Sequence, residues 1–335
     1  MDKSIHYYGI GFLARAAGFN RQHALTIAYA SQYVDSATEG EPIRVGDTFF
    51  DPVRTAHYGL KAFDWGVQKK IFIPFHFIPA RPFDPDHGPF SFVTAANSPF
   101  ANMVFRQACR ASRDETSRLI GIGIALHTLA DSWSHDGFSG KADPLNDVES
   151  IQLFRDGAWK HLLLENIYLD IMPKIGHAQA GYYPDDSYLR WKYVRDATKT
   201  EIVRDNPAEY AAAAETMYRL LAATKKLDSA PALPWKEIES SVLALLADPE
   251  ANVAKRCGAW RSLYKSVFGE ARGFDYDPLQ WRQEALGGDV AWDDFRQTEF
   301  RHLAFAMKTG FYETRWVKFH RAALRQRNFV LERLL

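Results

Sequence analysis

The sequence LHTLADSWSH, residues 126–135, decides how the whole chain is interpreted. It places His127, Asp131 and His135 four residues apart, and side chains at this spacing lie on one face of a helix. At about 1.5 Å of rise per residue, the two histidines lie roughly 12 Å apart at the backbone, which is far for binding one ion. A carboxylate between them can instead contact two ions. The pattern therefore predicts a site with several metal ions, bridged by Asp131.

Apolar residues recur every three or four positions over most of the chain, and this period predicts helices. Residues 41–105 are instead rich in proline, glycine and aromatic side chains, which indicates a long functional loop region with at most short strands. We expect an all-α fold: a multi-helix bundle with a long aromatic, loop-rich insertion and extra C-terminal helices. The predicted helical segments cover residues 22–33, 113–135, 147–171, 207–224, 235–247, 252–268 and 293–334, and the last, which is too long for one element, is expected to bend around Gly310.

The length of 335 residues suits one large domain or two smaller ones. We assign residues 1–225 to a metal-binding helical domain and residues 226–335 to a C-terminal helical extension packed on it. The stretch from Ala230 to Pro234 has two prolines and suggests the boundary. A single domain is the alternative, because no feature shows that the C-terminal helices fold alone.

The composition narrows the possible partners. The chain has 41 basic and 41 acidic residues, so it carries no specific signal for nucleic acid. No run approaches the roughly 20 apolar residues that span a bilayer. Arg15 interrupts the apolar run that a secretory signal would need, so we expect a cytoplasmic protein. The two cysteines, Cys109 and Cys257, match no metal-ligand spacing.

A site with several metal ions needs ligands from other parts of the chain. Asp35 ends a helix rich in small residues, and His6 precedes an apolar helix that can carry it inward. His76 lies among phenylalanines and prolines in an apolar stretch. An imidazole buried there has to form a hydrogen bond or bind a metal, because an unsatisfied buried polar group is costly. His57 competes with His76 for this role.

His135 needs partners as well, and two segments compete to supply them. One is the loop that contains His177 and Asp185. The other places His161 and Glu165 four residues apart on a predicted helix, which is a good spacing for metal ligands. The residues alone do not decide between the two segments.

Three features resemble the zinc-dependent phospholipase C and single-strand nuclease superfamily. They are the central helix with Asp131 between two histidines, Asp35 at the end of an alanine-rich helix, and the later Gly176-His177. The resemblance implies a trinuclear zinc cluster held among helices and an activity that cleaves phosphodiesters. It also implies that His6 takes the place of an early histidine ligand.

Two features depart from that superfamily. Three residues separate Asp131 from His135, whereas the better-known members have slightly more. Those enzymes also bind a metal through the amino group of a processed chain, whereas this sequence begins at Met1. Both departures concern the completeness of a third metal site.

A longer resemblance, from residue 1 to about residue 220, is to a family of uncharacterised bacterial proteins. It favours His76 over His57 and His177 over His161, and it implies no activity. The phrases that match are His6–Tyr8, Ala17–Phe19, Ile27–Asp35, Pro74–Phe77, His127–Gly140 and Gly176–Trp191.

Clustered divalent ions lower the pKa of bound water and contact the oxygens of a phosphoryl group. We therefore predict a phosphoric ester hydrolase with two or three zinc ions, iron or manganese being alternatives, that acts on a small-molecule or lipid-headgroup phosphoester. The predicted catalytic residues are Asp35 and Asp131, because both are ligands and Asp35 can also orient or deprotonate the attacking water. The predicted metal ligands are His6, Asp35, His76, His127, Asp131, His135, His177 and Asp185.

Alternative functions stay open. A helical site of histidines and carboxylates can hold two irons and activate oxygen, and a metal can also stabilise a non-catalytic interaction protein. His135-Asp136 matches the dipeptide of helical phosphohydrolases with a His…His-Asp…Asp set. We rank that set lower, because it leaves His127 and Asp131 unexplained.

Overall fold

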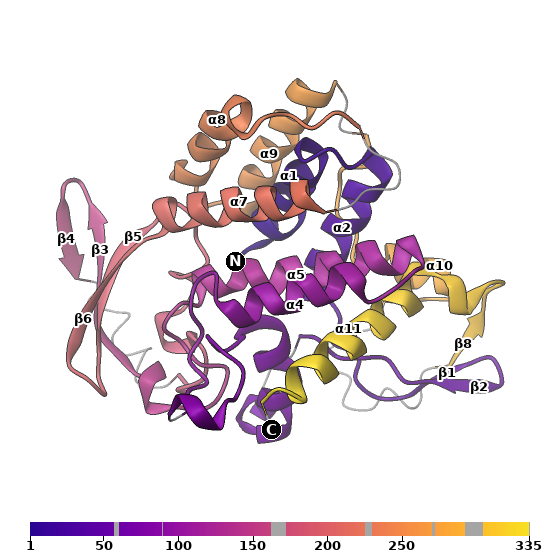
Figure 1. Ribbon diagram of the computed structural model, residues 1–335, viewed down its shortest axis with the longest axis horizontal. Coiled ribbons are helices and arrows are strands. Elements are labelled where there is room, and N and C mark those ends of the chain that lie inside the picture. Colours follow the sequence, from indigo (N-terminus) through magenta and orange to yellow (C-terminus); the bar gives the residue numbers. More distant parts are fainter. Residues whose placement is uncertain are drawn as a thin grey trace.

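Helix α5 (Glu115–Ser134) runs through the middle of the molecule (Figure 1). All its residues from Ile122 to Ser132 are buried, and a helix that is buried all round needs neighbours on every side. Those neighbours are α2 (Arg21–Tyr33), α4 (Pro99–Arg110), α7 (Asn206–Ala223) and α11 (Arg315–Leu331). The helix that carries the HxxxDxxxH pattern is therefore the centre of the fold.

The computed structural model describes residues 1–56, 60–88, 90–161, 172–224, 230–269, 272–291 and 304–334. Irregular helices of the 3-10 or π type are labelled η. The other helical elements are η1 (Ser4–Gly9), α1 (Ile10–Ala16), η2 (Leu60–Phe63), α3 (Trp65–Val67), η3 (Gln68–His76), η4 (Pro85–His87), η5 (Pro144–Asn146), η6 (Ala178–Ala180), α8 (Trp235–Ala247), α9 (Val253–Phe268), α10 (Gln280–Ala285) and η8 (Phe311–Glu313).

The prediction of an all-α fold is wrong. About 52% of the structure is helical, and 14% is strand in two four-stranded sheets, so the fold is mixed α/β. Figure 1 shows the two sheets at opposite ends of the molecule, with the helices between them. The helical part of the prediction therefore applies to the centre of the molecule, and the error lies at its two ends.

The first sheet replaces the described part, residues 147–161, of the helix predicted for residues 147–171. Its strands are antiparallel in the order β4-β3-β5-β6. The β3–β4 hairpin turns at Asp156 and Gly157, whose φ angles of 52° and 75° are those of the type I′ turn that Asp-Gly favours. Ile151 and Leu153, two residues apart on β3, are buried on one face. The strands are β3 (Val148–Arg155), β4 (Ala158–His161), β5 (Arg190–Arg195) and β6 (Thr200–Asp205).

The second sheet joins the aromatic insertion to the C-terminal part, because β1 pairs in parallel with β8. It also places a strand, β8, where the described part of the helical segment predicted for residues 293–334 begins. The break expected at Gly310 is present, because this residue has a φ of 71° and α11 begins only after it. Residues 162–171 and 292–303, parts of two predicted helices, lie outside the described residues. The strands, in sheet order, are β2 (Thr48–Phe50), β1 (Ile43–Val45), β8 (Ala304–Met307) and β7 (Leu286–Gly287).

The aromatic insertion contains more helix than we expected. Its element η3 is a π-helix that includes Pro74, and η1 near the amino terminus is a second π-helix. Such helices are rare and often lie at functional sites, and these two carry His6 and His76. Gln326 of α11 supports η3 by donating a hydrogen bond to the Pro74 carbonyl (3.0 Å).

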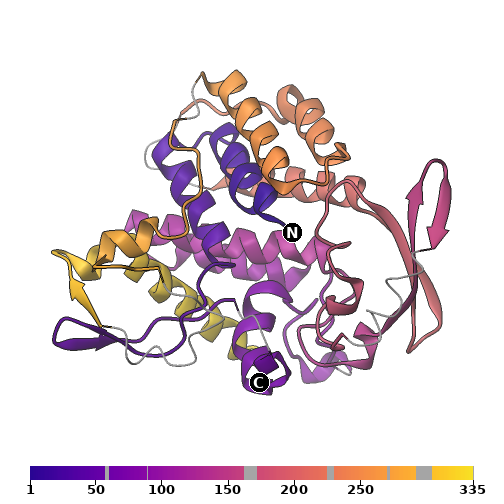
Figure 2. The ribbon, with the colours of Figure 1, turned by 180° about the vertical axis from the view of Figure 1, so that it is seen from behind.

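The amino-terminal and C-terminal parts share one apolar core. It includes Phe12 of α1, Trp281 of α10 and Trp316 of α11, and α9 packs against η1. Viewed from behind, the amino terminus lies near the middle of the molecule, beside α5 (Figure 2). The boundary between residues 1–225 and 226–335 stays a prediction.

A buried ion pair joins the C-terminal helices to the segment that follows α2. Glu39 is fully buried, and its Oε2 lies 3.0 Å from Nη2 of Arg282 on α10. Its Oε1 lies 3.2 Å from His320 Nε2 and 3.3 Å from Trp316 Nε1, both on α11. Arg282 also donates to the Ser36 carbonyl. The segment that begins with Asp35 is therefore fixed from the C-terminal side.

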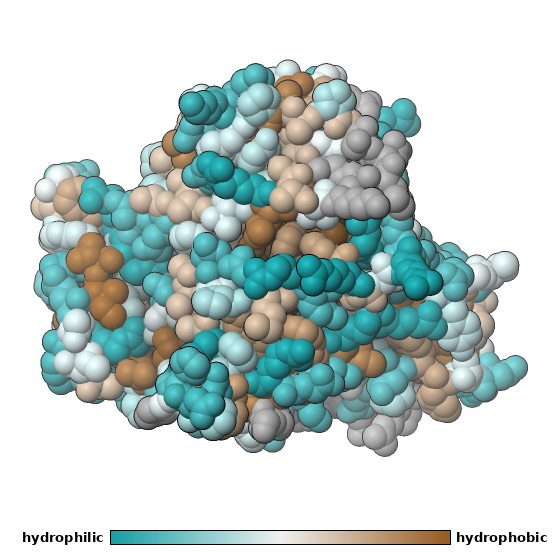
Figure 3. Space-filling view, viewed as in Figure 1, coloured by the Kyte–Doolittle hydropathy of each residue, from teal (hydrophilic) through white to brown (hydrophobic). Residues whose placement is uncertain are grey.

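One face of the molecule is mostly polar (Figure 3). Apolar side chains gather between α4 and α7, where a groove of about 450 Å³ is lined partly by Phe105, Cys109, Leu220 and Ala223. No described helix combines the length and the apolar character that crossing a membrane requires.

Gly123 allows α2 and α5 to approach each other closely. A Cβ at this position would lie 2.3 Å from the Ile27 carbonyl oxygen and 2.7 Å from the Ala30 Cβ. Because these atoms belong to a packed helix, we expect Gly123→Ala to lower the free energy of unfolding by about 1–3 kcal/mol in denaturant titrations. Gly121→Ala, where the nearest atoms are 3.8 Å away, should be neutral or stabilising by up to about 1 kcal/mol. Equal destabilisation by both changes would contradict the close approach.

The buried Glu39 should make the stability of the fold depend on pH. Burial alone raises the pKa of Glu39, but Arg282 and His320 lower it by more, from 4.5 to about 2. The carboxylate therefore stabilises the fold above pH 4.5, and this contribution is lost as the pH falls towards 2. It amounts to at most about 3 kcal/mol. Denaturant unfolding between pH 2 and 7 should show Glu39→Gln less stable at pH 7, because the buried charge of Arg282 then loses the carboxylate that balances it. Its decline below pH 4.5 should be shallower. A decline as steep as in the wild type would refute the assignment.

Candidate metal centre

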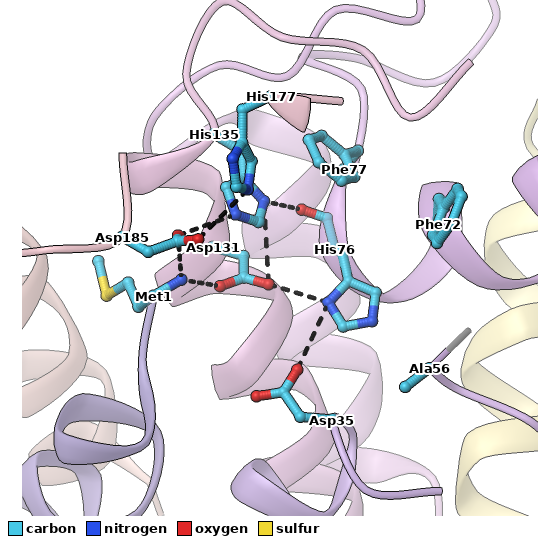
Figure 4. Close-up of a pocket in the computed structure, with 10 residues that line it drawn as sticks. All are labelled: Met1, Asp35, Ala56, Phe72, His76, Phe77, Asp131, His135, His177 and Asp185. Atoms are coloured by element: carbon cyan, nitrogen blue, oxygen red, sulfur yellow. Dashed lines mark hydrogen bonds and ion pairs between the residues drawn. The ribbon is translucent and has the colours of Figure 1, made fainter. Parts of the chain in front are cut away.

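The predicted ligands meet at the C-terminal half of α5, around a cavity of about 190 Å³ (Figure 4). His6 and His127 are fully buried and contact Asp131. The structure therefore brings all eight predicted ligands together. The residues that line the cavity are Met1, Asp35, Ala56, Phe72, His76, Phe77, Asp131, His135, His177 and Asp185.

Asp131 lies at the centre of the site and is only 1% exposed. Its Oδ1 lies 2.7 Å from the Met1 amine and 3.0 Å from His6 Nε2. Its Oδ2 lies 3.1 Å from His76 Nδ1 and 3.2 Å from His127 Nε2. Burial alone raises the pKa of Asp131, but the amine and the nearby histidines hold it well below its usual value. The carboxylate is therefore ionised, and its two oxygens face different partners, as in a bridging ligand.

Two groups of ligands share His127. We call His6, His127 and Asp131 the His6 group, and Asp35, His76 and His127 the Asp35 group. Within each group, one ligand atom per residue lies within 4.8 Å of the others. His127 Nε2 lies 3.5 Å from Asp35 Oδ1 and 3.2 Å from His76 Nδ1. The rings of His6 and His127 are stacked, with centroids 3.8 Å apart.

A third group, the Asp185 group, consists of His135, His177 and Asp185. The two oxygens of Asp185 lie 3.2 Å from His135 Nε2 and 3.3 Å from His177 Nε2. The loop that carries Asp185 is held by α7. Asn206 donates to two carbonyls of this loop, and Tyr210 donates to a third, that of Pro184 (2.9 Å).

Three of the imidazoles use their second nitrogen to contact a backbone carbonyl. His76 Nε2 contacts the Thr55 carbonyl, His135 Nδ1 that of His76, and His177 Nδ1 that of Gly181, each at 2.8 Å. When these nitrogens carry the proton, the other nitrogen of each ring presents a lone pair towards the carboxylates. Proteins commonly orient metal-binding histidines in this way.

The hydrogen bonding and the protonation of the site histidines also suit metal binding. Within the described part of the chain, Nδ1 of His6 and of His127 are buried without a hydrogen-bond partner, and His6 Nε2 lies 3.0 Å from Asp131 Oδ1 without forming a hydrogen bond to it. Burial lowers the pKa of His127 and of His177 to about 4, so both are neutral at pH 7, which is the form that binds metals. Burial alone lowers the pKa of His76, but its contact with Asp131 raises it, so a proton competes with a metal for Nδ1. The donor set of five imidazoles and three carboxylates fits divalent ions.

The Met1 amine is a part of the site that our predicted ligand set did not include. It donates to Asp131 and to Ser134 Oγ (3.0 Å), and it lies 2.9 Å from Asp185 Oδ1. Burial alone lowers the pKa of this amine, but the two carboxylates raise it to about 11, so it is charged at pH 7. The amine therefore joins the His6 group to the Asp185 group. Two signals could have suggested it: the closeness of Met1 to His6 along the chain, and the resemblance to enzymes that use a terminal amino group at their metal site.

The Gly176-His177 phrase has a structural reason. Gly176 has a φ of 54°, and a Cβ there would lie 2.4 Å from the Phe77 ring. That ring stacks on His135 with centroids 4.4 Å apart. The glycine thus makes room for the ring that orients one ligand, next to the residue that supplies another.

Of the competing residues, the structure describes His161 and Asp136, and neither joins the site. His161 is exposed on strand β4, so the helical spacing of four residues does not apply to it. Asp136 accepts a hydrogen bond from the Ala96 N–H and belongs to none of the three groups. His57 and Glu165 lie outside the described residues.

Comparison with known proteins gives a family but no activity. The model of a family of unknown function, DUF6765, matches residues 1–334. No curated protein and no solved structure matches the chain. What the site does has to be argued from its geometry.

We expect Asp131→Asn to abolish metal binding while the fold is retained, because the change removes the charge that faces two of the ligand groups. Metal content per chain by atomic emission and the circular dichroism spectrum test this, on protein purified without chelators. Asp136→Asn is the matched control, five residues along the chain, and should keep the wild-type metal content. Full metal occupancy in Asp131→Asn would count decisively against the centre.

Proposed function

The chain belongs to that family of unknown function, and we propose from the site alone that it is a zinc-dependent hydrolase of phosphoesters. One arrangement supports the proposal above all. Three groups of imidazole and carboxylate donors lie together: two of them share His127, Asp131 also contacts His76, and six of the eight donors line one cavity. Sites with several divalent ions are used mainly to bind and cleave phosphoryl groups.

The ligand balance favours zinc. Five imidazoles and three carboxylates suit Zn²⁺, whereas carboxylates dominate the di-iron sites of helical bundles. Zinc ions held by the His6, Asp35 and Asp185 groups would supply Lewis acidity to a phosphoryl group and lower the pKa of a water molecule.

The charges around the cavity explain why an anionic substrate would need cations. Histidines apart, the charged groups among the described lining residues are the carboxylates of Asp35, Asp131 and Asp185 and the Met1 amine. Three negative charges face one positive charge, so the site on its own repels a phosphate group. We infer that phosphate recognition depends on bound metal.

Asp35 is the residue best placed to handle the proton of an attacking water. It is less buried than Asp131, with 29% of its side chain exposed. Gln32 donates to its Oδ2 at 3.2 Å, while Oδ1 faces His127 and His76. A carboxylate held in this way can orient a water molecule and accept its proton.

The other side of the cavity is apolar. Ala56, Phe72 and Phe77 form this side, and Figure 4 shows the Phe77 ring near His135 and the Phe72 ring farther from Asp131 than His76 is. Apolar side chains exclude water and accommodate a carbon group. A cavity of about 190 Å³ suits a small phosphoester with a partly apolar alcohol.

We expect the zinc-loaded protein to hydrolyse a member of a panel of aryl phosphomonoesters, aryl phosphodiesters and phospholipid headgroups, and chelation to abolish this activity. Asp35→Asn should lower kcat by about 10²–10⁴-fold, the usual contribution of a general base. His161→Gln is the control and should retain full activity. In calorimetry, inorganic phosphate should bind the zinc-loaded protein and not the chelated one.

Each other outcome points to a different function. Wild-type protein that binds zinc but hydrolyses nothing on the panel would refute hydrolysis of these esters. Bound iron with oxygen-dependent chemistry would favour the oxidoreductase alternative. Protein without bound metal would favour an interaction protein.

A further inference from the structure

We propose that Arg256 of α9 is a positioning residue that holds the Met1 amine against Asp185, where the His6 group meets the Asp185 group. The inference rests on one part of the proposed function, namely that the His6 group and the Asp185 group bind metal. Arg256 touches no predicted ligand itself. It acts through Asp2 and Asp186, the residues that follow Met1 and Asp185 in the chain.

The guanidinium of Arg256 is buried and held on several sides, with 3% of its side chain exposed. Its Nη2 contacts Asp2 Oδ2 and lies 2.6 Å from Asp186 Oδ1. Its Nη1 donates to the Glu250 carbonyl (2.7 Å), and its centre lies 5.4 Å from the centroid of the Tyr188 ring. A planar guanidinium fixed in this way sets the distance between the two carboxylates that it bonds.

This bond has a specific consequence for the site. Asn206 and Tyr210 hold the backbone of the Asp185 loop to α7, whereas Arg256 bonds this loop and the amino-terminal segment at the same time. The separation of 2.9 Å between the Met1 amine and Asp185 Oδ1 therefore depends on Arg256.

The charge of Arg256 matters as well as its shape. Asp2 and Asp186 add two carboxylates beside a site that already has three. Without the guanidinium, the two would repel each other and the site carboxylates, and the two segments would move apart. Supporting residues that orient a ligand without touching the metal commonly change metal affinity 10–100-fold.

Zinc titration against a chromophoric chelator tests the role of Arg256. We expect Arg256→Met to weaken zinc binding at the Asp185 group about 10–100-fold and to leave the other zinc equivalents nearly unchanged. The zinc equivalent that is lost in His177→Gln is the one that the Asp185 group binds. Arg261→Met is the matched control, because Arg261 lies on the same helix and forms a half-exposed ion pair with Asp275 (2.7 Å). It should keep the wild-type affinities.

A second measurement needs neither metal nor activity. Acetic anhydride labels amino groups, and mass spectrometry of the amino-terminal peptide measures how fast the Met1 amine reacts. The buried, charged amine should react slowly in the wild type and in Arg261→Met. Local opening of the segment in Arg256→Met should accelerate labelling about tenfold or more.

Milder variants keep the proposal testable if Arg256→Met does not fold. Arg256→Lys retains the charge but loses the planar fork, and Asp186→Asn weakens one of the two bonds without leaving a buried charge unpaired. Both should show the same two effects at smaller size. In whichever of these variants folds, unchanged zinc binding together with unchanged labelling would overturn the proposal. An equal loss of zinc affinity in all three groups would overturn it as well.

Failure of the proposed function is distinguishable from failure of this inference. If wild-type protein binds no zinc, the proposed function fails, and the labelling rates of Arg256→Met and Arg261→Met alone decide the role of Arg256. If zinc binds but neither zinc affinity nor labelling depends on Arg256, only the inference fails.

Discussion

The site depends on one constraint: a carboxylate, Asp131, is ionised and buried near the C-terminal end of the central helix. A buried charge is tolerated only when it is paired and hydrogen-bonded. Here the Met1 amine and three imidazoles contact its two oxygens. These partners come from η1, η3 and α5 itself, so the same electrostatic demand determines how the amino-terminal segment and the aromatic insertion pack against the central helix.

Several parts of this arrangement were readable from the sequence, because they depend on local spacing. Polar residues at a spacing of four on an apolar helix pointed to the ligand face of α5, and Asp35 was conspicuous at the end of a helix of small residues. His76 was conspicuous because an imidazole in an apolar stretch needs a partner. The structure brings these side chains together, and all of them except His127 line one cavity.

Other parts depend on contacts that local patterns do not encode. The segment from residue 147 contains helix-favouring residues, and the Asp156-Gly157 turn and the pairing of β3 with β5 override that preference. The Met1 amine and Arg256 enter through ion pairs between distant segments. Neither Asp2 nor Asp186 shows, from its neighbours in the chain, that one guanidinium joins them.

These long-range ion pairs also fix when the site can form. The contact between Met1 and Asp131 spans 130 residues, and that between Asp2 and Arg256 spans 254. Contacts between such distant segments close late in folding, because the loop entropy has to be overcome first. While the chain is still emerging from the ribosome, the amino-terminal segment has no Arg256 to bind. If Arg256 has the proposed role, the Met1 amine and Asp185 reach their final separation only after Arg256 itself has been synthesised. A metal ion at this part of the site would then bind to an assembled fold rather than guide its assembly.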